Sequence, residues 1–178
     1  MDYNYYMNMA LNQAKKAFNR GEFPVGCVIV DHKKVIASGA RRGTTTAQSV
    51  FSEIDHAEIR ALKHLEQVDE KFKPEELILF STMEPCLMCF GAIILSGINK
   101  IVYAYEDPMG GSTKCDLNKL APLYAKADIS VVSGVLRQKS LDLFYNFFNT
   151  KTNLYWKNSY LETYTIEQKK RQDQSKRI

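Results

Sequence analysis

The sequence predicts an α/β protein in which helices cover both faces of a layered sheet. Short, nearly continuous apolar runs alternate with longer segments whose apolar residues recur at helical spacing. Their order is helix, strand, strand, helix, followed by three strand–helix pairs, and such an alternation builds a layered sheet. The chain of 178 residues is long enough for one compact domain with a sizeable core.

The first half of the chain predicts a helix followed by a hairpin. The helix covers about residues 4–19, and Gly21 ends it. A buried strand over 25–30 and a returning strand over 35–39 flank a polar turn. Residues 41–52 are polar without a clear period, so we expect a surface loop long enough to carry function.

The second half begins with a helix expected near His56, with Asp55 as its N-cap. A buried strand follows over 77–81, and Pro85 occupies a favourable helix-start position before an apolar helix over 86–95. The remaining predicted elements are strands over 101–105 and 129–132, a helix over 137–149, and an appended helix within 153–178.

Composition places the chain among ordinary globular proteins. Apolar residues make up 45% and charged residues 25%, and the net charge of +4 permits an anionic partner without requiring one. No apolar run approaches the roughly 18–20 residues of a membrane span. Residues 1–5 have neither a basic start nor an apolar signal core. The sequence therefore predicts a cytoplasmic location and no membrane partner.

Three residues have the types and spacing of a catalytic zinc site. Cys86 and Cys89 are three apart at a helix start, so their sulfurs fall on one face. His56 offers a nitrogen from a second helix start. A zinc ion with three protein ligands keeps a fourth position for water, whose pKa it lowers toward about 7. We therefore predict one Zn²⁺ per chain at these residues.

Glu58 lies two residues after His56 and is not needed as a ligand. A carboxylate beside the zinc-bound water can take its proton and deliver it to a ring nitrogen and to departing ammonia. Glu58 is the predicted general acid and base.

Each half of this pattern has other interpretations. A His-x-Glu pair is common at surface helix starts, and Cys-x-x-Cys also occurs in redox pairs, zinc knuckles and apolar cores. A four-cysteine site would need Cys27 and Cys115, which lie in an apolar strand and a distant loop. The combination of His-x-Glu with a later Pro-Cys-x-x-Cys is the known signature of zinc deaminases.

With these residues in view, the chain resembles the cytidine deaminase superfamily, most of all its tRNA adenosine deaminase branch. The resemblance runs from about Met7 to Phe148 and includes the motifs at 21–26, 56–59, 83–89, 91–93, 107–108, 110–111, 134–136 and 147–148. It implies a three-layer α/β/α fold with a five-stranded mixed sheet. It also implies a homodimer, with His56, Cys86 and Cys89 as zinc ligands and Glu58 as the proton shuttle.

The same resemblance implies the substrate-binding residues. Pro24 and Val25 would line the pocket, and backbone N–H groups near Ala57 and Cys86 would hold the substrate. Asp107 matches an acidic position beside the substrate path in that branch.

The chain departs from the branch at Arg41. The branch typically carries Gly-His-Asn-Arg after the second strand, where this chain has Gly-Ala-Arg-Arg at 39–42, and the following loop is longer. An arginine at the pocket rim would pair with a phosphate or carboxylate of the substrate. The alternative is a solvated loop arginine.

We predict a zinc-dependent deaminase domain over 1–152 and a C-terminal helical extension over 153–178 without a counterpart in the branch. Aromatic residues of the extension would either stack on RNA bases or dock the appended helix, and docking is favoured. They are Tyr155, Trp156, Tyr160 and Tyr164.

The predicted function is hydrolytic removal of an exocyclic amino group from a nucleobase, resembling tRNA adenosine-to-inosine deamination. One alternative is a deaminase of a free nucleobase, nucleoside or nucleotide of the guanine, adenine or cytosine type. A second is a non-catalytic zinc-binding subunit, which Glu58 argues against because a structural site needs no such carboxylate.

Overall fold

The computed structural model describes residues 1–45 and 51–175, and its centre is a five-stranded mixed sheet. The strands are β1 (Gly26–Asp31), β2 (Lys34–Ala40), β3 (Leu77–Met83), β4 (Lys100–Tyr105) and β5 (Ser130–Val132). Their order is β2-β1-β3-β4-β5. β1 runs antiparallel to β2 and β3, whereas β3, β4 and β5 are parallel. The predicted fold class is confirmed.

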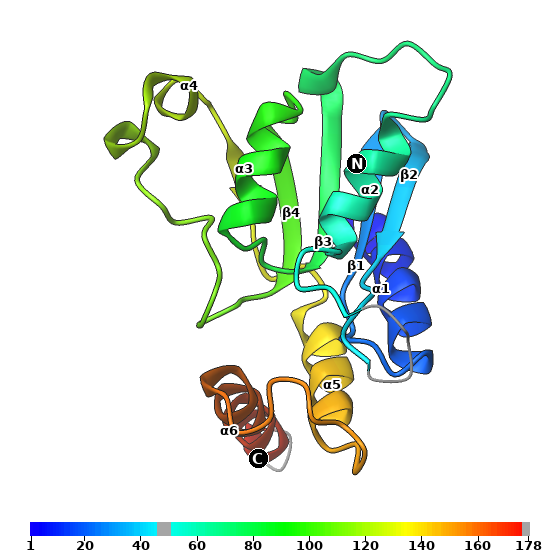
Figure 1. Ribbon diagram of the computed structural model, residues 1–178, viewed down its shortest axis with the longest axis vertical. Helices are drawn as coiled ribbons and strands as arrows, with labels where there is room; N and C mark the ends of the chain where they lie inside the picture. The colour runs from blue at the N-terminus through cyan, green and yellow to red at the C-terminus, as the bar shows by residue number, and fades with distance from the viewer. Residues whose placement is uncertain (46–50, 176–178) are drawn as a thin grey trace.

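Helices cover both faces of this sheet. They are α1 (Tyr3–Asn19), α2 (Ala57–Leu65), α3 (Leu87–Leu95), α4 (Pro122–Ala125), α5 (Arg137–Phe148) and α6 (Tyr160–Ser175), with short 3-10 turns at Pro74–Glu76 and Leu117–Lys119. Figure 1 shows α2 and α3 side by side on one face, while α1 lies on the other. None of the helices in the described ranges is long and apolar enough to cross a membrane.

The inner strands contribute side chains to two apolar clusters, one on each face. Cys27 and Ile29 of β1 belong to the cluster with α2 and α3, whereas Val28 and Val30 belong to the cluster with α1. All seven residues of β3 are buried. Strands buried on both faces carry continuous apolar runs, which is the pattern that predicted them.

The predicted cap of α2 is wrong. His56, not Asp55, occupies the N-cap position, with extended backbone angles of φ −70° and ψ 155°. The chain stays extended for one residue more than expected, so the helix begins at Ala57. The Asp55 carboxylate instead accepts hydrogen bonds from Arg60, at 3.0 and 3.3 Å.

The C-terminal extension packs against the domain. Leu161 is 1% exposed and belongs to the main cluster. Tyr105 and Thr165 share a buried hydrogen bond of 3.2 Å, and Lys169 pairs with Asp142 at 2.8 Å. Figure 1 shows α6 beside α5 at one end of the molecule. These contacts agree with docking of the appended helix.

The packing of α2 on the hairpin allows no side chain at Gly39. A Cβ there would lie 2.0 Å from the Ala57 carbonyl oxygen and 2.6 Å from the Ala61 nitrogen. We expect Gly39→Ala to reduce the free energy of unfolding by about 1–3 kcal/mol, because two backbones must move apart. Chemical denaturation measures this, with Ser38→Ala as the neighbouring control. Equal stability of the two variants would contradict the close approach.

Candidate active site

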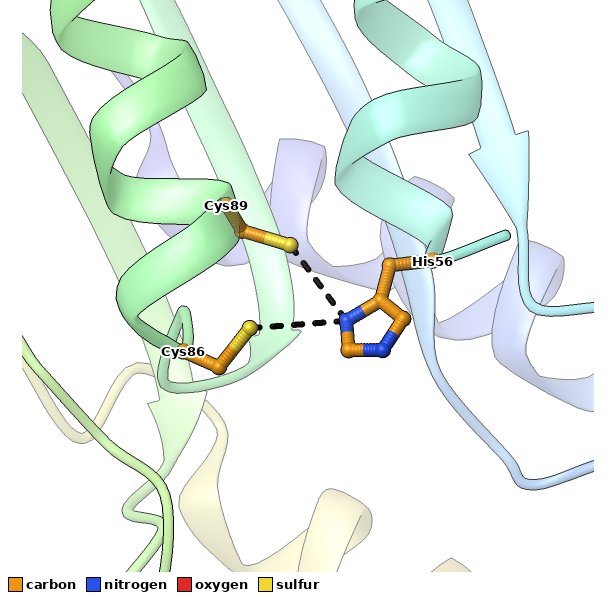
Figure 2. Close-up of side chains that lie close together, drawn as sticks. All are labelled: His56, Cys86 and Cys89. Atoms are coloured by element: carbon orange, nitrogen blue, oxygen red, sulfur yellow. Dashed lines mark hydrogen bonds between the residues drawn. The ribbon is translucent and has the colours of Figure 1, made fainter. Parts of the chain in front are cut away.

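Two helix starts bring the predicted ligands together. His56 directly precedes α2 and Cys86 directly precedes α3, and both residues hold extended N-cap conformations. Cys89 lies in the first turn of α3, so its side chain faces the same space as that of Cys86. Figure 2 shows the imidazole of His56 turned toward both sulfurs.

The three donor atoms have the spacing of a metal site. His56 Nδ1 lies 3.6 Å from Cys86 Sγ and 3.4 Å from Cys89 Sγ. All three donor atoms lie within 4.8 Å of one another. Two thiolates and one imidazole suit Zn²⁺, balance its charge and leave a fourth position open. This donor set therefore fits a catalytic zinc ion.

Without a metal, the two cysteines differ in protonation. Hydrogen bonds from Cys89 and from His56 lower the pKa of Cys86 to about 4. The hydrogen bond to Cys86 and burial raise the pKa of Cys89. Burial opposes protonation of His56, but the hydrogen bond to Cys86 and the nearby Glu58 carboxylate raise its pKa overall. The Cys86 sulfur is therefore a thiolate at neutral pH, which is the form that binds a metal ion.

Glu58 lies in the first turn of α2 and is 3% exposed. The Ser81 hydroxyl donates to its Oε1 at 2.8 Å, and the Cys89 thiol donates to its Oε2 at 3.6 Å. Burial raises the pKa of this carboxyl group. A carboxyl group held in place beside the metal ligands, with a raised pKa, can both accept and give a proton near neutral pH.

A buried carboxylate fixes the loop that faces Cys86. Glu84 accepts hydrogen bonds from the backbone of Asp107 at 3.2 Å and from the Thr113 backbone and hydroxyl at 3.3 and 2.5 Å. A Cβ at Gly111 would lie 2.5 Å from Glu84 Oε2. Gly110 and Gly111 are thus part of a tight turn against Glu84.

The metal-ligand group opens into a largely apolar cavity of about 420 Å³. Its walls are formed by Phe23, Val25, Arg41, Glu53, His56, Ala57, Glu58, Met83, Glu84, Cys86, Asp107, Met109, Gly110, Tyr155, Trp156 and Leu161. Four of the predicted substrate residues, Val25, Arg41, Ala57 and Asp107, are in this set. Pro24 is buried but does not line the cavity. Burial raises the pKa of Asp107, whose carboxylate accepts from the backbone of Met109 and Gly110.

Sequence reasoning missed one wall of the cavity. Glu53 comes from the end of the polar loop, and Tyr155 and Trp156 come from the extension. The solvated alternative for Arg41 is also wrong, because its side chain is only 2% exposed. These residues are far apart in the chain and follow no motif, so no sequence signal pointed to their meeting.

Comparison with known proteins assigns the catalytic segment to a family. The family model of the cytidine and deoxycytidylate deaminase zinc-binding region matches residues 1–105. The tRNA-specific adenosine deaminase of Bacillus subtilis (strain 168) is 34% identical over 143 residues, which cover 80% of this chain and 86% of the relative.

Two solved structures share the architecture. A tRNA:A34 deaminase that is 28% identical superposes with a TM-score of 0.61 over 78% of this chain and 98% of its own. The guanine deaminase of Nitrosomonas europaea is 20% identical and superposes with a TM-score of 0.62 over 82% and 84%. The second likeness concerns the fold alone.

We expect Cys86→Ser to lose most of the bound zinc, because a hydroxyl replaces one of two thiolate ligands. Metal analysis of the dialysed protein measures this against one zinc per chain in the wild type. Cys115→Ser is the matched control, since Cys115 is exposed and outside the ligand group. Full zinc retention in Cys86→Ser would contradict the assignment.

Proposed function

The chain belongs to the cytidine and deoxycytidylate deaminase family of zinc-dependent hydrolytic deaminases, and we propose that its substrate is an adenosine within tRNA. The name and the 34% identity of the Bacillus subtilis relative support this substrate. The observation that carries the chemistry is the buried Glu58 carboxylate beside a three-donor group in an apolar cavity.

In this proposal His56, Cys86 and Cys89 hold one zinc ion. The metal supplies activation of water at neutral pH, because coordination lowers the pKa of water. Residues 1–152 form the deaminase domain and 153–178 the extension, of which Tyr155, Trp156 and Leu161 complete one wall of the pocket.

Glu58 moves the protons. Hydrolysis adds the oxygen of water to the ring carbon and releases the amino group as ammonia. Ser81 fixes Oε1 of Glu58. Oε2 faces Cys89, and once Cys89 is a deprotonated ligand this oxygen is the one that accepts a proton from the attacking water. The same oxygen passes this proton to the adjacent ring nitrogen. It then takes the second proton of the added water from the hydroxyl on the ring carbon and gives it to the departing amine.

The other pocket residues bind and exclude water. Val25 and Ala57, which begins α2, provide walls for a planar ring. Asp107 and Arg41 lie on the same cavity. Because the walls are mostly apolar, the protons that Glu58 carries exchange slowly with bulk water.

We expect Glu58→Gln to retain zinc and to lower kcat by about 10²- to 10⁴-fold, because the amide cannot shuttle a proton. Inosine formed in tRNA and zinc content, measured on the same preparations, test this. Wild-type activity in Glu58→Gln would remove the proposed role. A zinc-loaded wild type inactive on tRNA and on every nucleobase and nucleoside would favour a non-catalytic subunit instead.

A free nucleobase or nucleoside is the second candidate substrate. The aromatic residues that the extension contributes to the cavity wall favour it. Tyr155 and Trp156 line the cavity and belong to the extension, for which the sequence shows no counterpart in the tRNA deaminase branch. Ammonia release from tRNA, adenosine, adenine, guanine and cytosine separates the candidates. Turnover of a free base or nucleoside, with none on tRNA, would establish the second candidate over the first.

A homodimer is the assembly that we propose, because α3 exposes an apolar face. Leu87, Met88 and Leu95 are 63%, 37% and 62% exposed. Gly91 lies among them with open space beyond its α carbon, so the backbone of a partner helix can come close. The proposed location is the cytoplasm, because all four cysteines are free and thiolate ligands need a reducing compartment.

We expect Leu95→Glu to convert the dimer to a monomer, because a charge would be buried in the interface. Light scattering after size exclusion measures the mass. Tyr5→Glu is the control variant. Tyr5 is an exposed residue of α1, which covers the opposite face of the sheet, so this change should leave the mass unchanged. A monomeric wild type would contradict the dimer.

A further inference from the structure

Three segments that are far apart in the chain meet at one wall of the cavity. Arg41 directly follows β2, Glu53 lies shortly before α2, and Tyr155 belongs to the extension. Arg41 and Tyr155 are 114 positions apart, yet their side chains are in hydrogen-bond contact. This meeting indicates that the three segments act as one structural unit, which we call the Arg41–Glu53–Tyr155 wall.

Arg41 is the anchor of this wall. Its guanidinium donates to the carbonyl oxygens of Arg42 at 2.6 Å and Ser52 at 2.9 Å, and to the Tyr155 hydroxyl at 3.5 Å. Glu53 lies 3.6 Å away and supplies the opposite charge. The buried cation is thus matched by protein groups, and the wall offers no free charge for a substrate phosphate or carboxylate.

Tyr155 carries the surface of the wall. Its hydroxyl donates to Glu53 Oε2 at 2.7 Å, and its ring packs on Phe23 with centroids 5.4 Å apart. Burial raises the pKa of this phenol, which therefore remains a neutral donor. Phe23 also lines the cavity, so the two rings form a continuous aromatic side.

Trp156 extends this side toward the mouth of the cavity. Its ring meets that of Tyr155 edge to face at 5.6 Å, and it remains 42% exposed. Its backbone adopts a left-handed φ of 55°, which is rare for a bulky residue and occurs only where the surroundings enforce it. The buried Leu161 at the start of α6 holds the segment from its other end.

We infer that Tyr155 is a specificity-determining residue of the pocket, with Arg41 and Glu53 as the positioning residues that hold it against the plane of the bound nucleobase. An aromatic ring can stack on any base. Because contacts from three segments hold Tyr155 in place, the position of its ring limits the space in the cavity for substituents on the bound base. The zinc ligands and Glu58 act on the exocyclic amine, so selection among bases depends on the cavity walls, of which this wall is one. The inference rests on the proposed function only in that the pocket binds a nucleobase.

The single tryptophan of the chain gives a direct binding signal, because it lines the cavity. The test uses zinc-loaded Glu58→Gln protein, which binds without turnover. Adenosine, guanosine, cytidine and their free bases are titrated while Trp156 fluorescence is followed. We expect saturable quenching by the preferred ligand.

In this background we expect Tyr155→Ala to weaken the preferred ligand about tenfold, since stacking on one ring contributes roughly that much. The difference in affinity among the bases should shrink as well. Tyr155→Phe and Glu53→Ala keep the ring but remove the hydrogen bond between its hydroxyl and Glu53, so both should reduce affinity several-fold. Tyr160→Ala, which removes a tyrosine of the same extension that is 61% exposed and outside the cavity lining, should change nothing.

Unchanged affinities and an unchanged ranking of bases in Tyr155→Ala would overturn the inference, as would the absence of quenching by every ligand. If Tyr155→Ala has a clearly lower melting temperature than the background protein, the Tyr155→Phe variant and the Glu53 variant decide the outcome instead. Inosine formation in tRNA is measured separately. The protein could be inactive on tRNA and still prefer another base, with that preference lost in Tyr155→Ala. This result would refute the proposed substrate but support the role of Tyr155 in specificity.

Discussion

Three donor atoms from two helices must stay within a few ångströms of each other, and much of the structure serves that requirement. The donors lie within 4.8 Å because α2 and α3 begin side by side on one face of the sheet. β3 lies between β1 and β4, so the helix that follows β3 is placed beside the one that follows the hairpin. The buried contacts at Gly39 and Gly111 keep both helix starts in position.

The same arrangement explains the state of Glu58. A carboxylate in the first turn of α2, two residues after a ligand, is carried into the interior by the helix that positions His56. Ser81 from β3 holds one oxygen, and burial favours the protonated form. The reaction therefore depends on rigid elements, whereas the opposing wall is made from a loop and an extension.

Sequence patterns predicted the rigid part well and the wall poorly. Buried strands such as β1 and β3 were predictable because continuous apolar runs reflect burial on both faces. The ligands were predictable because metal chemistry constrains residue type and spacing. The prediction of Asp55 as the N-cap of α2 was wrong, because the residue at which a helix begins depends on local backbone angles. The burial of Arg41 was not predictable, because it depends on Tyr155, which is 114 positions away and follows no repeating pattern.

The most direct test of the account follows the oxygen atom. Zinc-loaded protein is incubated with tRNA in ¹⁸O-labelled water, and the released ammonia and the nucleosides are quantified by mass spectrometry. The account predicts one labelled oxygen per inosine formed and an equal amount of ammonia. Zinc-loaded protein that releases no ammonia from tRNA, nucleosides or free bases would contradict it.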